Sequence, residues 1–123
     1  MSVKMQVGFL GAGMMASALI DGIVARGVRT ADQIHCADVY APARDAAAAK
    51  GYRATPSNAD VAARAGDAVF LAVKPHCVAG ACADVDAVPS EAVVVSIAAG
   101  VTLAALEAAL PGRRVIRVSE WPR

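Results

Sequence analysis

The stretch VGFLGAGMMASALIDG, residues 7–22, limits what this chain can fold into more than any other. An apolar run comes first, and Gly11, Gly13 and Ala16 then complete the pattern G-x-G-x-x-G/A. Between a strand and a helix, the first glycine permits a tight turn and the second lets a pyrophosphate approach the backbone. The N–H groups and dipole at the helix start favour the anion. The pattern predicts a dinucleotide-binding turn; glycines needed only for packing are the alternative.

The same stretch also has features of a secretory signal. Lys4 precedes the apolar run, and Ala16, Ser17 and Ala18 form an acceptable cleavage-like tripeptide. Against this, the glycines interrupt the run and the apolar periodicity continues past the supposed cut. We therefore expect an intact N-terminus that is part of the folded domain.

Composition and charge narrow the class of protein. A chain of 123 residues makes one domain, and a net charge of +1 gives no electrostatic footprint for nucleic acid. No apolar run reaches the roughly 18 residues of a membrane span. Three cysteines cannot all pair within one chain and form no zinc-like pair, so we expect small buried apolar thiols in a reducing cytoplasm. These cysteines are Cys36, Cys77 and Cys82.

Apolar runs rich in β-branched residues alternate with helical patterns along the whole chain. Most runs are continuous, as expected for strands that are covered on both faces. The predicted strands are Met5–Leu10, Ile34–Asp38, Tyr52–Ala54, Ala68–Val73, Val93–Ile97 and Val115–Val118.

Five helical patterns lie between these strands. In the first, Met15, Ala18, Leu19, Gly22 and Ile23 share one predicted face, and Gly27 ends the helix. The others are Pro42–Lys50, a short helix capped by Ser57 and Asp60 that ends near Gly66, His76–Asp86 and Thr102–Leu110. This alternation predicts an α/β fold, a doubly wound Rossmann-like parallel sheet of about six strands with helices on both faces.

Asp38 ends the second predicted strand, where such folds carry the residue that reads the adenosine ribose. A carboxylate there can bind both ribose hydroxyls and repels a 2′-phosphate, which favours NAD over NADP. Arg44, a few residues on, could reverse this by pairing with the phosphate. A solvated aspartate at a loop edge is the alternative.

Two further loops are expected at the carboxyl ends of strands, where open α/β sheets bind ligands. LAVKPHCV places Lys74 and Pro75 after the fourth buried strand, and SIAAGVTL follows the fifth. The lysine is either a cofactor neighbour or simply solvated, and the small residues leave room for a flat ring or pack tightly. His35 and His76 have no acidic or nucleophilic partner at a telling spacing, so both are expected to be structural or on the surface.

Five segments together resemble the N-terminal domain of the pyrroline-5-carboxylate reductases: VGFLGAGMMA, TPSNADV, FLAVKPH, VVVSIAAGVTLAAL and RRVIRV. They span residues 4–118 in the order and spacing of that family. The resemblance implies NADP or NAD as cofactor and 1-pyrroline-5-carboxylate as the small-molecule substrate, which the family reduces to L-proline by hydride transfer to the imine carbon. It implies no catalytic and no metal-binding residue in this part of the chain.

The resemblance also assigns cofactor-binding positions. The pyrophosphate turn would be residues 10–15, Asp38 would read the ribose or its 2′-phosphate, and Asn58 would contact the adenosine end. The full predicted set is Leu10, Gly11, Ala12, Gly13, Met14, Met15, Asp38, Asn58, Ala72, Val73, Lys74, Pro75, Ala98 and Ala99.

The chain departs from the family in three places. Asp38 stands where NADPH-preferring members often have a small polar residue, and Met14 replaces a polar side chain. After VIRV the family continues into a helical domain that forms the dimer and most of the substrate pocket, whereas this chain ends in SEWPR. We therefore expect a cofactor domain over residues 1–118, a divergent tail over 119–123, an absent helical domain, and little activity or oligomer formation from the chain alone.

Two other functions remain open on the sequence alone. One is a non-catalytic nucleotide-binding or interaction fragment. The other is the cofactor domain of a dehydrogenase that acts on a hydroxy acid, because one fold serves many reactions.

Overall fold

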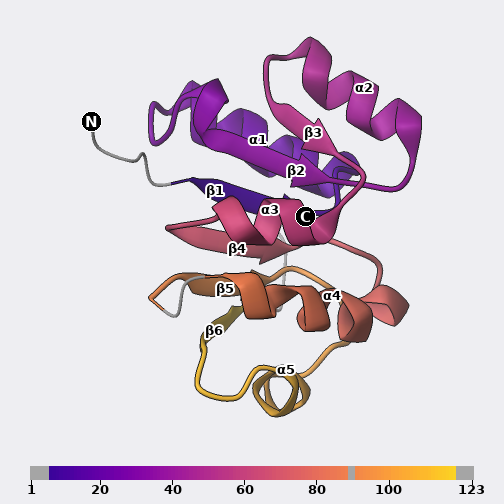
Figure 1. Ribbon diagram of the computed structural model, residues 1–123, viewed down its shortest axis with the longest axis vertical. Helices are drawn as coiled ribbons and strands as arrows, with labels where there is room; N and C mark the ends of the chain where they lie inside the picture. The colour runs from indigo at the N-terminus through magenta and orange to yellow at the C-terminus, as the bar shows by residue number, and fades with distance from the viewer. Residues whose placement is uncertain (1–5, 89–90, 119–123) are drawn as a thin grey trace.

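The fold is a six-stranded parallel sheet with helices on both faces, seen in a computed structural model that describes residues 6–88 and 91–118 (Figure 1). The strand order is β3-β2-β1-β4-β5-β6. The chain winds outward from β1 to one edge, crosses back, and continues from β4 to the other edge. The predicted doubly wound sheet is therefore confirmed, and its switch point lies between β1 and β4.

The strands and helices follow the alternation predicted from the sequence. The strands are β1 Val7–Leu10, β2 Ile34–Ala37, β3 Arg53–Thr55, β4 Ala68–Leu71, β5 Val93–Ser96 and β6 Arg114–Arg117. The α-helices are α1 Met14–Ala25, α2 Ala41–Ala49, α3 Asn58–Arg64, α4 Val78–Asp84 and α5 Leu103–Ala109. Short 3-10 turns are η1 Ala31–Gln33, η2 Pro75–Cys77 and η3 Val85–Ala87. Residues 5 and 119–123, which carry parts of the sequence predictions, lie outside the described residues.

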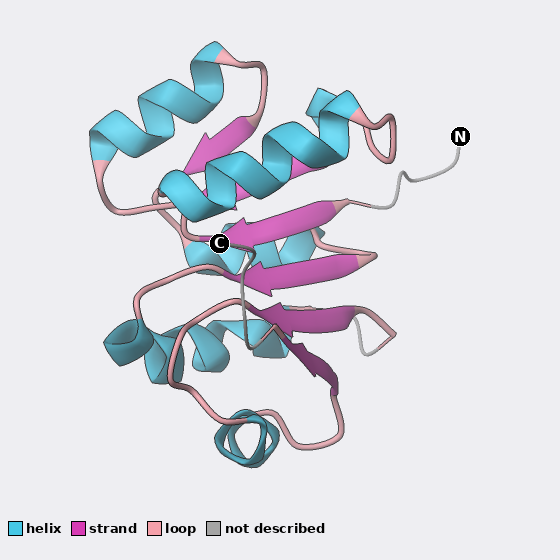
Figure 2. Ribbon diagram, turned by 180° about the vertical axis from the view of Figure 1, so that it is seen from behind, coloured by secondary structure: helices cyan, strands magenta, loops and turns pink. Residues whose placement is uncertain are grey.

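Two hydrophobic cores lie on opposite faces of the sheet. Figure 2 shows α1 and α2 in front of one face, with α3, α4 and α5 behind the other. On the α1 side, Phe9 is fully buried and stacks on Phe70 with ring centroids 4.5 Å apart. On the α3 side, Val61, Leu71 and Leu106 are among the buried residues. Strand pairing sets the register of the carboxyl ends of β1, β4 and β5 between these two layers of helices.

Gly8 in β1 allows α3 to lie directly against the centre of the sheet. A Cβ atom at this position would come within 2.7 Å of Val61 Cγ1 and 3.2 Å of Ala65 Cβ. Val61 in α3 and Ala65, which directly follows that helix, are both buried. The glycine is therefore required by close helix–strand packing, which the sequence motif alone did not indicate.

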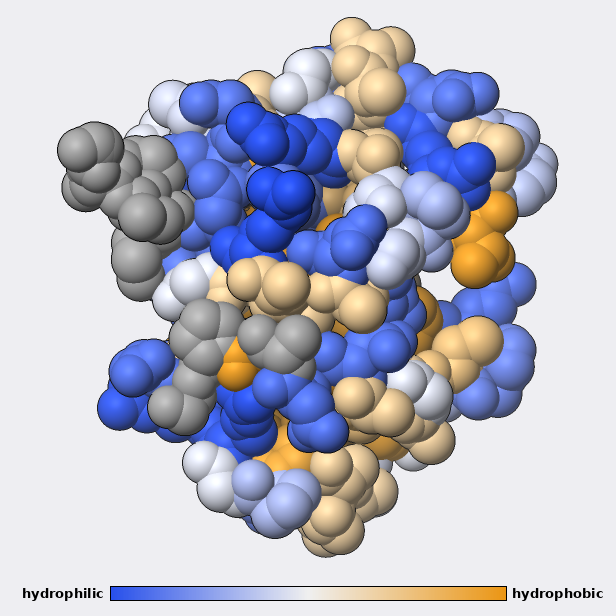
Figure 3. All heavy atoms as spheres, in the orientation of Figure 1, coloured by the Kyte–Doolittle hydropathy of each residue, from blue (hydrophilic) through white to orange (hydrophobic). Residues whose placement is uncertain are grey.

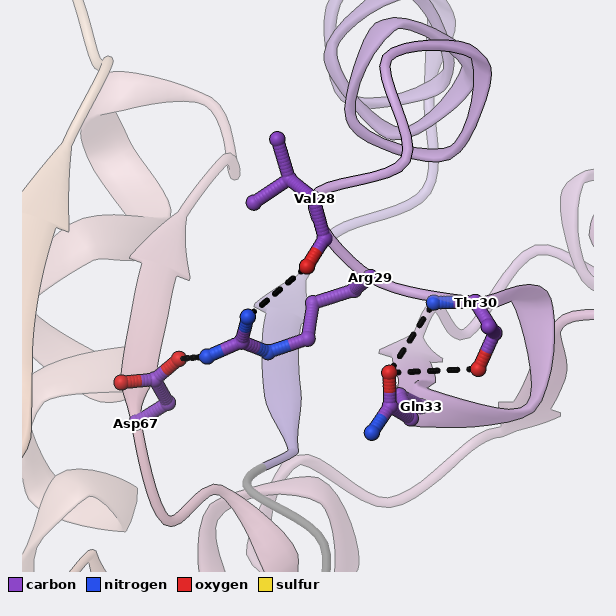
Figure 4. A network of polar contacts seen from close by, with 5 residues as sticks. All are labelled: Val28, Arg29, Thr30, Gln33 and Asp67. Atoms are coloured by element: carbon purple, nitrogen blue, oxygen red, sulfur yellow. Dashed lines mark hydrogen bonds and ion pairs between the residues drawn. The ribbon is translucent and has the colours of Figure 1, made fainter.

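An ion pair connects the loop after α1 to the start of β4, in the other half of the sheet. The Arg29 guanidinium pairs with Asp67, which immediately precedes β4, and also donates to the carbonyl oxygen of Val28 (Figure 4). Beside it, the N–H and hydroxyl of Thr30 donate to Gln33 Oε1, as Figure 4 also shows. The Gln33 N–H donates back to the Thr30 carbonyl oxygen at the start of η1. These contacts are at the amino ends of the strands, so they brace the sheet away from its ligand-binding edge.

Three sequence predictions were wrong in detail. The buried face of α1 is centred on Ala16 and Ile20, while Met15 is 46% exposed and Ala18 and Gly22 are also exposed. The periodicity misplaced this face because alanine, methionine and glycine are compatible with either side of a helix. The predicted helix at 76–86 is divided into η2, α4 and η3, since Pro75 starts a tighter turn.

The third error concerns a cysteine. The three cysteines are free, but only Cys36 and Cys82 are buried, whereas Cys77 is exposed in η2. Burial raises the pKa of the Cys36 thiol to about 11, which makes it an inert core residue. His35 is buried and His76 is exposed.

Candidate functional site

A cleft of about 300 Å³ opens at the carboxyl ends of β1, β4 and β5, at the switch point of the sheet. Three segments that are far apart in the sequence form its walls. They are the glycine turn with the start of α1, the loop after β4, and the loop after β5. The lining residues are Gly13, Met14, Met15, Ala16, Ala72, Val73, Lys74, Pro75, Ile97, Ala98, Ala99 and Val118.

Gly11 makes the tight turn between β1 and α1. Its φ angle is +110°, and a Cβ atom here would lie 2.5 Å from the carbonyl oxygen of Ala72. The Gly11 N–H donates to the Ala37 carbonyl oxygen at 2.7 Å, which ties the turn to the end of β2. A side chain would therefore be strained by the backbone and would collide with the neighbouring loop.

Gly13 leaves open space at the start of α1. It is the N-cap residue, and a Cβ atom placed on it would meet nothing within 4 Å. The first intrahelical bond runs from the Ser17 N–H to the Gly13 carbonyl oxygen at 2.8 Å, so the preceding N–H groups of the helix have no acceptor within it. This is the geometry that binds a phosphate at a helix N-terminus, on a helix of 12 residues.

Asp38 connects the glycine turn to the loop after β2. Its Oδ2 accepts the N–H of Ala12 at 3.0 Å, and its Oδ1 accepts the N–H of Tyr40 at 2.9 Å. The Arg44 guanidinium donates to the backbone carbonyl oxygen of Asp38 at 3.0 Å. The carboxylate is thus held in place by two backbone donors with a cation beside it, and each oxygen keeps a lone pair for a further donor.

Hydrogen bonds also shape the other two walls of the cleft. After β4, the Cys77 N–H donates to the Lys74 carbonyl oxygen at 2.8 Å, and Pro75 opens the short turn η2. After β5, the hydroxyl of Ser96 is completely buried and accepts the N–H of Ala98 at 3.3 Å. Both loops therefore present backbone and small side chains to the cleft, which leaves room for a flat ring.

A second, more open hollow of about 570 Å³ adjoins the glycine turn between α1 and α2. Met14 and Tyr40 contribute large exposed side chains, 92% and 64% exposed respectively. Gly13 and Met14 line both this hollow and the cleft. An elongated ligand that crosses the glycine turn would therefore have one half in each.

Most of the residues predicted from the sequence line one hollow or both. Leu10 and Gly11 are buried behind the turn, and Asp38 lies beside it. Asn58, the first residue of α3, lines neither hollow. Ala16, Ile97, Val118 and Tyr40 are among the lining residues outside the predicted set. Val118 reaches the cleft because its N–H bonds to Ser96 at 2.9 Å, a proximity that only the sheet register reveals.

The described part of the chain offers neither a metal site nor a membrane span. Among residues 6–88 and 91–118, no group of three histidine, cysteine or carboxylate side chains is placed to hold a metal ion. In those same ranges, no helix has the length and apolar character needed to cross a bilayer.

Comparison with known proteins gives the same picture as the geometry. The family model described as NADP oxidoreductase coenzyme F420-dependent matches residues 6–100. Pyrroline-5-carboxylate reductase of Methanosarcina acetivorans is 42% identical over 116 residues, which cover 92% of this chain and 43% of the relative. A solved pyrroline-5-carboxylate reductase from Coxiella burnetii superposes with a TM-score of 0.82 at 32% identity, covering 91% of this chain and 42% of that one.

A third similarity concerns the fold alone. The pyrroline carboxylate reductase of Plasmodium falciparum, solved with NADP bound, has a TM-score of 0.80 at 21% identity and covers 95% of this chain. The chain spans about two-fifths of the length of the relatives it matches. The resemblance to the N-terminal domain of pyrroline-5-carboxylate reductases is confirmed, and the chain belongs to the family described as NADP oxidoreductase coenzyme F420-dependent.

Proposed function

We propose that this chain is the cofactor-binding part of a reductase that converts 1-pyrroline-5-carboxylate to L-proline with NADPH or NADH. The observation that carries this is the cleft at the switch point, whose three walls come from the segments that resemble the reductase family. In this assignment residues 1–118 form the cofactor domain. A cytoplasmic location, and an oligomer only for a longer polypeptide, belong to the same proposal.

The residues of the cleft fit a dinucleotide. Gly13 leaves the space that a pyrophosphate needs, and the start of α1 provides N–H donors next to it. Asp38 and Tyr40 lie towards the hollow that would take the adenosine half, while Ala98 and Ala99 line the part that would take the nicotinamide.

The bound nicotinamide would supply the hydride, and the protein would hold the ring at the cleft. Ala72, Ala98 and Ala99 would leave room for the ring, with the Ser96 hydroxyl keeping the loop after β5 in place. We assign no catalytic group to this chain. Orientation of the imine then depends on the portion of the relatives that this chain does not span.

Cofactor binding is tested by thermal unfolding of the chain with and without NADPH or NADH. At one hundred times the dissociation constant, a ligand stabilises the folded state by about 2.7 kcal/mol, roughly 8–13 °C for a domain of this size. Gly13→Ala should weaken binding about tenfold and remove about 1.4 kcal/mol of that protection, because the new Cβ occupies the space left for the pyrophosphate.

Gly22→Ala is the matched control in the same helix. A Cβ atom there also meets nothing within 4 Å, but Gly22 lines neither hollow. It should stabilise the unliganded chain by about 0.5–1 kcal/mol through helix propensity and leave the cofactor increment unchanged. Absence of protection by either cofactor would refute the proposed site.

Activity of residues 1–123 with 1-pyrroline-5-carboxylate and NADPH is expected to be at least a thousandfold below that of a full-length relative. The reason is that substrate orientation supplies a large part of such rates. Oxidation of the cofactor is measured as the decrease in absorbance at 340 nm, where the reduced nicotinamide absorbs. Turnover comparable with that of the full-length reductase would contradict the assignment of this chain to the cofactor half.

Asp38→Ser should shift the preference between cofactors towards NADPH by about 10–100-fold. Removal of the carboxylate eliminates repulsion of a 2′-phosphate, and Arg44, which keeps its bond to the backbone carbonyl oxygen of residue 38, can pair with the phosphate through its remaining N–H groups. The ratio of the dissociation constants for NADH and NADPH, obtained by fluorescence titration, measures the change. Arg44→Gln in the Asp38→Ser background is expected to reverse it, and an unchanged ratio in Asp38→Ser would show that this position does not read the ribose.

A further inference from the structure

A separate groove of about 190 Å³ lies where α3 meets β2 and β3. It is on the face of the sheet opposite α1 and α2, and it shares no lining residue with the cleft or the second hollow. Figure 3 shows hydrophilic side chains gathered over this part of the molecule. The lining residues are His35, Arg53, Ala54, Thr55, Asp60 and Arg64.

His35 is the buried polar group of this groove. It is 6% exposed, it lines the groove from β2, and its ring makes no hydrogen bond with any other described residue. The ring nitrogens are not among the described side-chain polar atoms that are both fully buried and unpaired, so they open to the groove instead of being sealed in the core. The ring is therefore available to a ligand that enters the groove.

Two arginines face the same space. Arg53 is the register partner of His35 on β3, and Arg64 is the last residue of α3. Asp60, also on α3, is the one carboxylate among the lining residues. Within the described ranges, neither guanidinium has an ion pair or hydrogen bond to Asp60 or any other residue.

The charges of the groove affect the histidine as expected. Burial, followed by the positive charges of Arg53 and Arg64, lowers the pKa of His35. With His35 neutral, two guanidinium groups and one carboxylate leave a net positive charge around a small space. This combination matches a compact anion with several acceptor oxygens.

We propose that this groove binds a small tetrahedral dianion of the sulfate or phosphate type, with Arg53 and Arg64 pairing with its oxygens and His35 donating an N–H. None of its residues lines the cleft or the second hollow, so the proposal does not depend on the cofactor function. Binding and protonation of His35 are linked. The anion stabilises the imidazolium, so it raises the pKa of His35, and the affinity increases as the pH falls through that pKa.

The test uses inorganic sulfate, whose charge stays constant between pH 5 and 8, with sodium chloride at equal ionic strength as reference. Ring resonances of the two histidines are followed by NMR as a function of pH. Sulfate is expected to raise the apparent pKa of His35 by about one unit and to leave exposed His76 unchanged. Inorganic phosphate should act at the same residue, and equal shifts at both histidines would overturn the site.

Substitutions distinguish specific binding of sulfate in this groove from general electrostatic attraction of anions to the protein surface. Arg53→Gln and Arg64→Gln should each weaken sulfate binding about tenfold or more, whereas Arg114→Gln on the opposite edge strand β6 should not change it. Asp60→Asn should tighten binding several-fold, since it removes the one carboxylate. If all four variants bind sulfate equally, or if NADPH competes with sulfate for His35, the proposal is wrong.

Discussion

Replacement of Gly11 by alanine is expected to destabilise the chain by about 2–5 kcal/mol. The positive φ angle costs a residue with a side chain about 1–2 kcal/mol, and the collision with Ala72 adds about 1–3 kcal/mol. Urea denaturation followed by circular dichroism measures the change in the free energy of unfolding. Such a loss is a large part of the total stability of a domain of this size.

Gly13→Ala provides the comparison within the same turn. Gly13 has a φ angle of −75° and open space around its missing side chain, so its stability should change by no more than about 1 kcal/mol. The two substitutions thus separate the two glycines. Gly11 is needed for folding and Gly13 for binding, and equal losses of stability in both variants would contradict this division.

The second large effect is expected for Phe9→Ala, which should cost about 3–5 kcal/mol. Phe9 is fully buried in β1, and its ring stacks on Phe70 at 4.5 Å. Removal of the ring leaves a cavity between the centre of the sheet and α1, so the helix that carries the glycine turn loses its support. The free energy of unfolding, measured as above, gives the size of the loss.

Val28→Ala is a suitable control, since Val28 is 58% exposed at the end of the first helical unit. Its effect should stay within about 0.5 kcal/mol. If Phe9→Ala cost no more than this control, the core on the α1 side would not be packed as described.

The order of strands and helices could be predicted from the sequence because each element has a local cause. The run at residues 7–10 is apolar throughout, as a strand covered on both faces must be, and glycines or prolines separate the elements. The parallel arrangement follows, because strands that alternate with helices need crossover connections. The position of the cleft then depends only on the strand order.

The remaining features depend on contacts between distant segments. Nothing local to Val118 indicates that it lines the cleft, because its approach is set by the register of β5 and β6. Asn58, in turn, was assigned by resemblance and lies on neither hollow. The hydrogen bond between Asp38 and the Ala12 N–H, which spans 26 positions, is equally absent from any local pattern.

That last hydrogen bond has a consequence for how coenzyme preference can evolve in this fold. The carboxylate proposed to discriminate between the two coenzymes also fixes the turn proposed to bind their shared pyrophosphate. A substitution that removes this carboxylate to reduce discrimination between the coenzymes therefore also weakens binding of both coenzymes at first. A reversal of coenzyme preference, in evolution or by design, would therefore need another acceptor for the Ala12 N–H. A hydroxyl group at position 38 is one such acceptor.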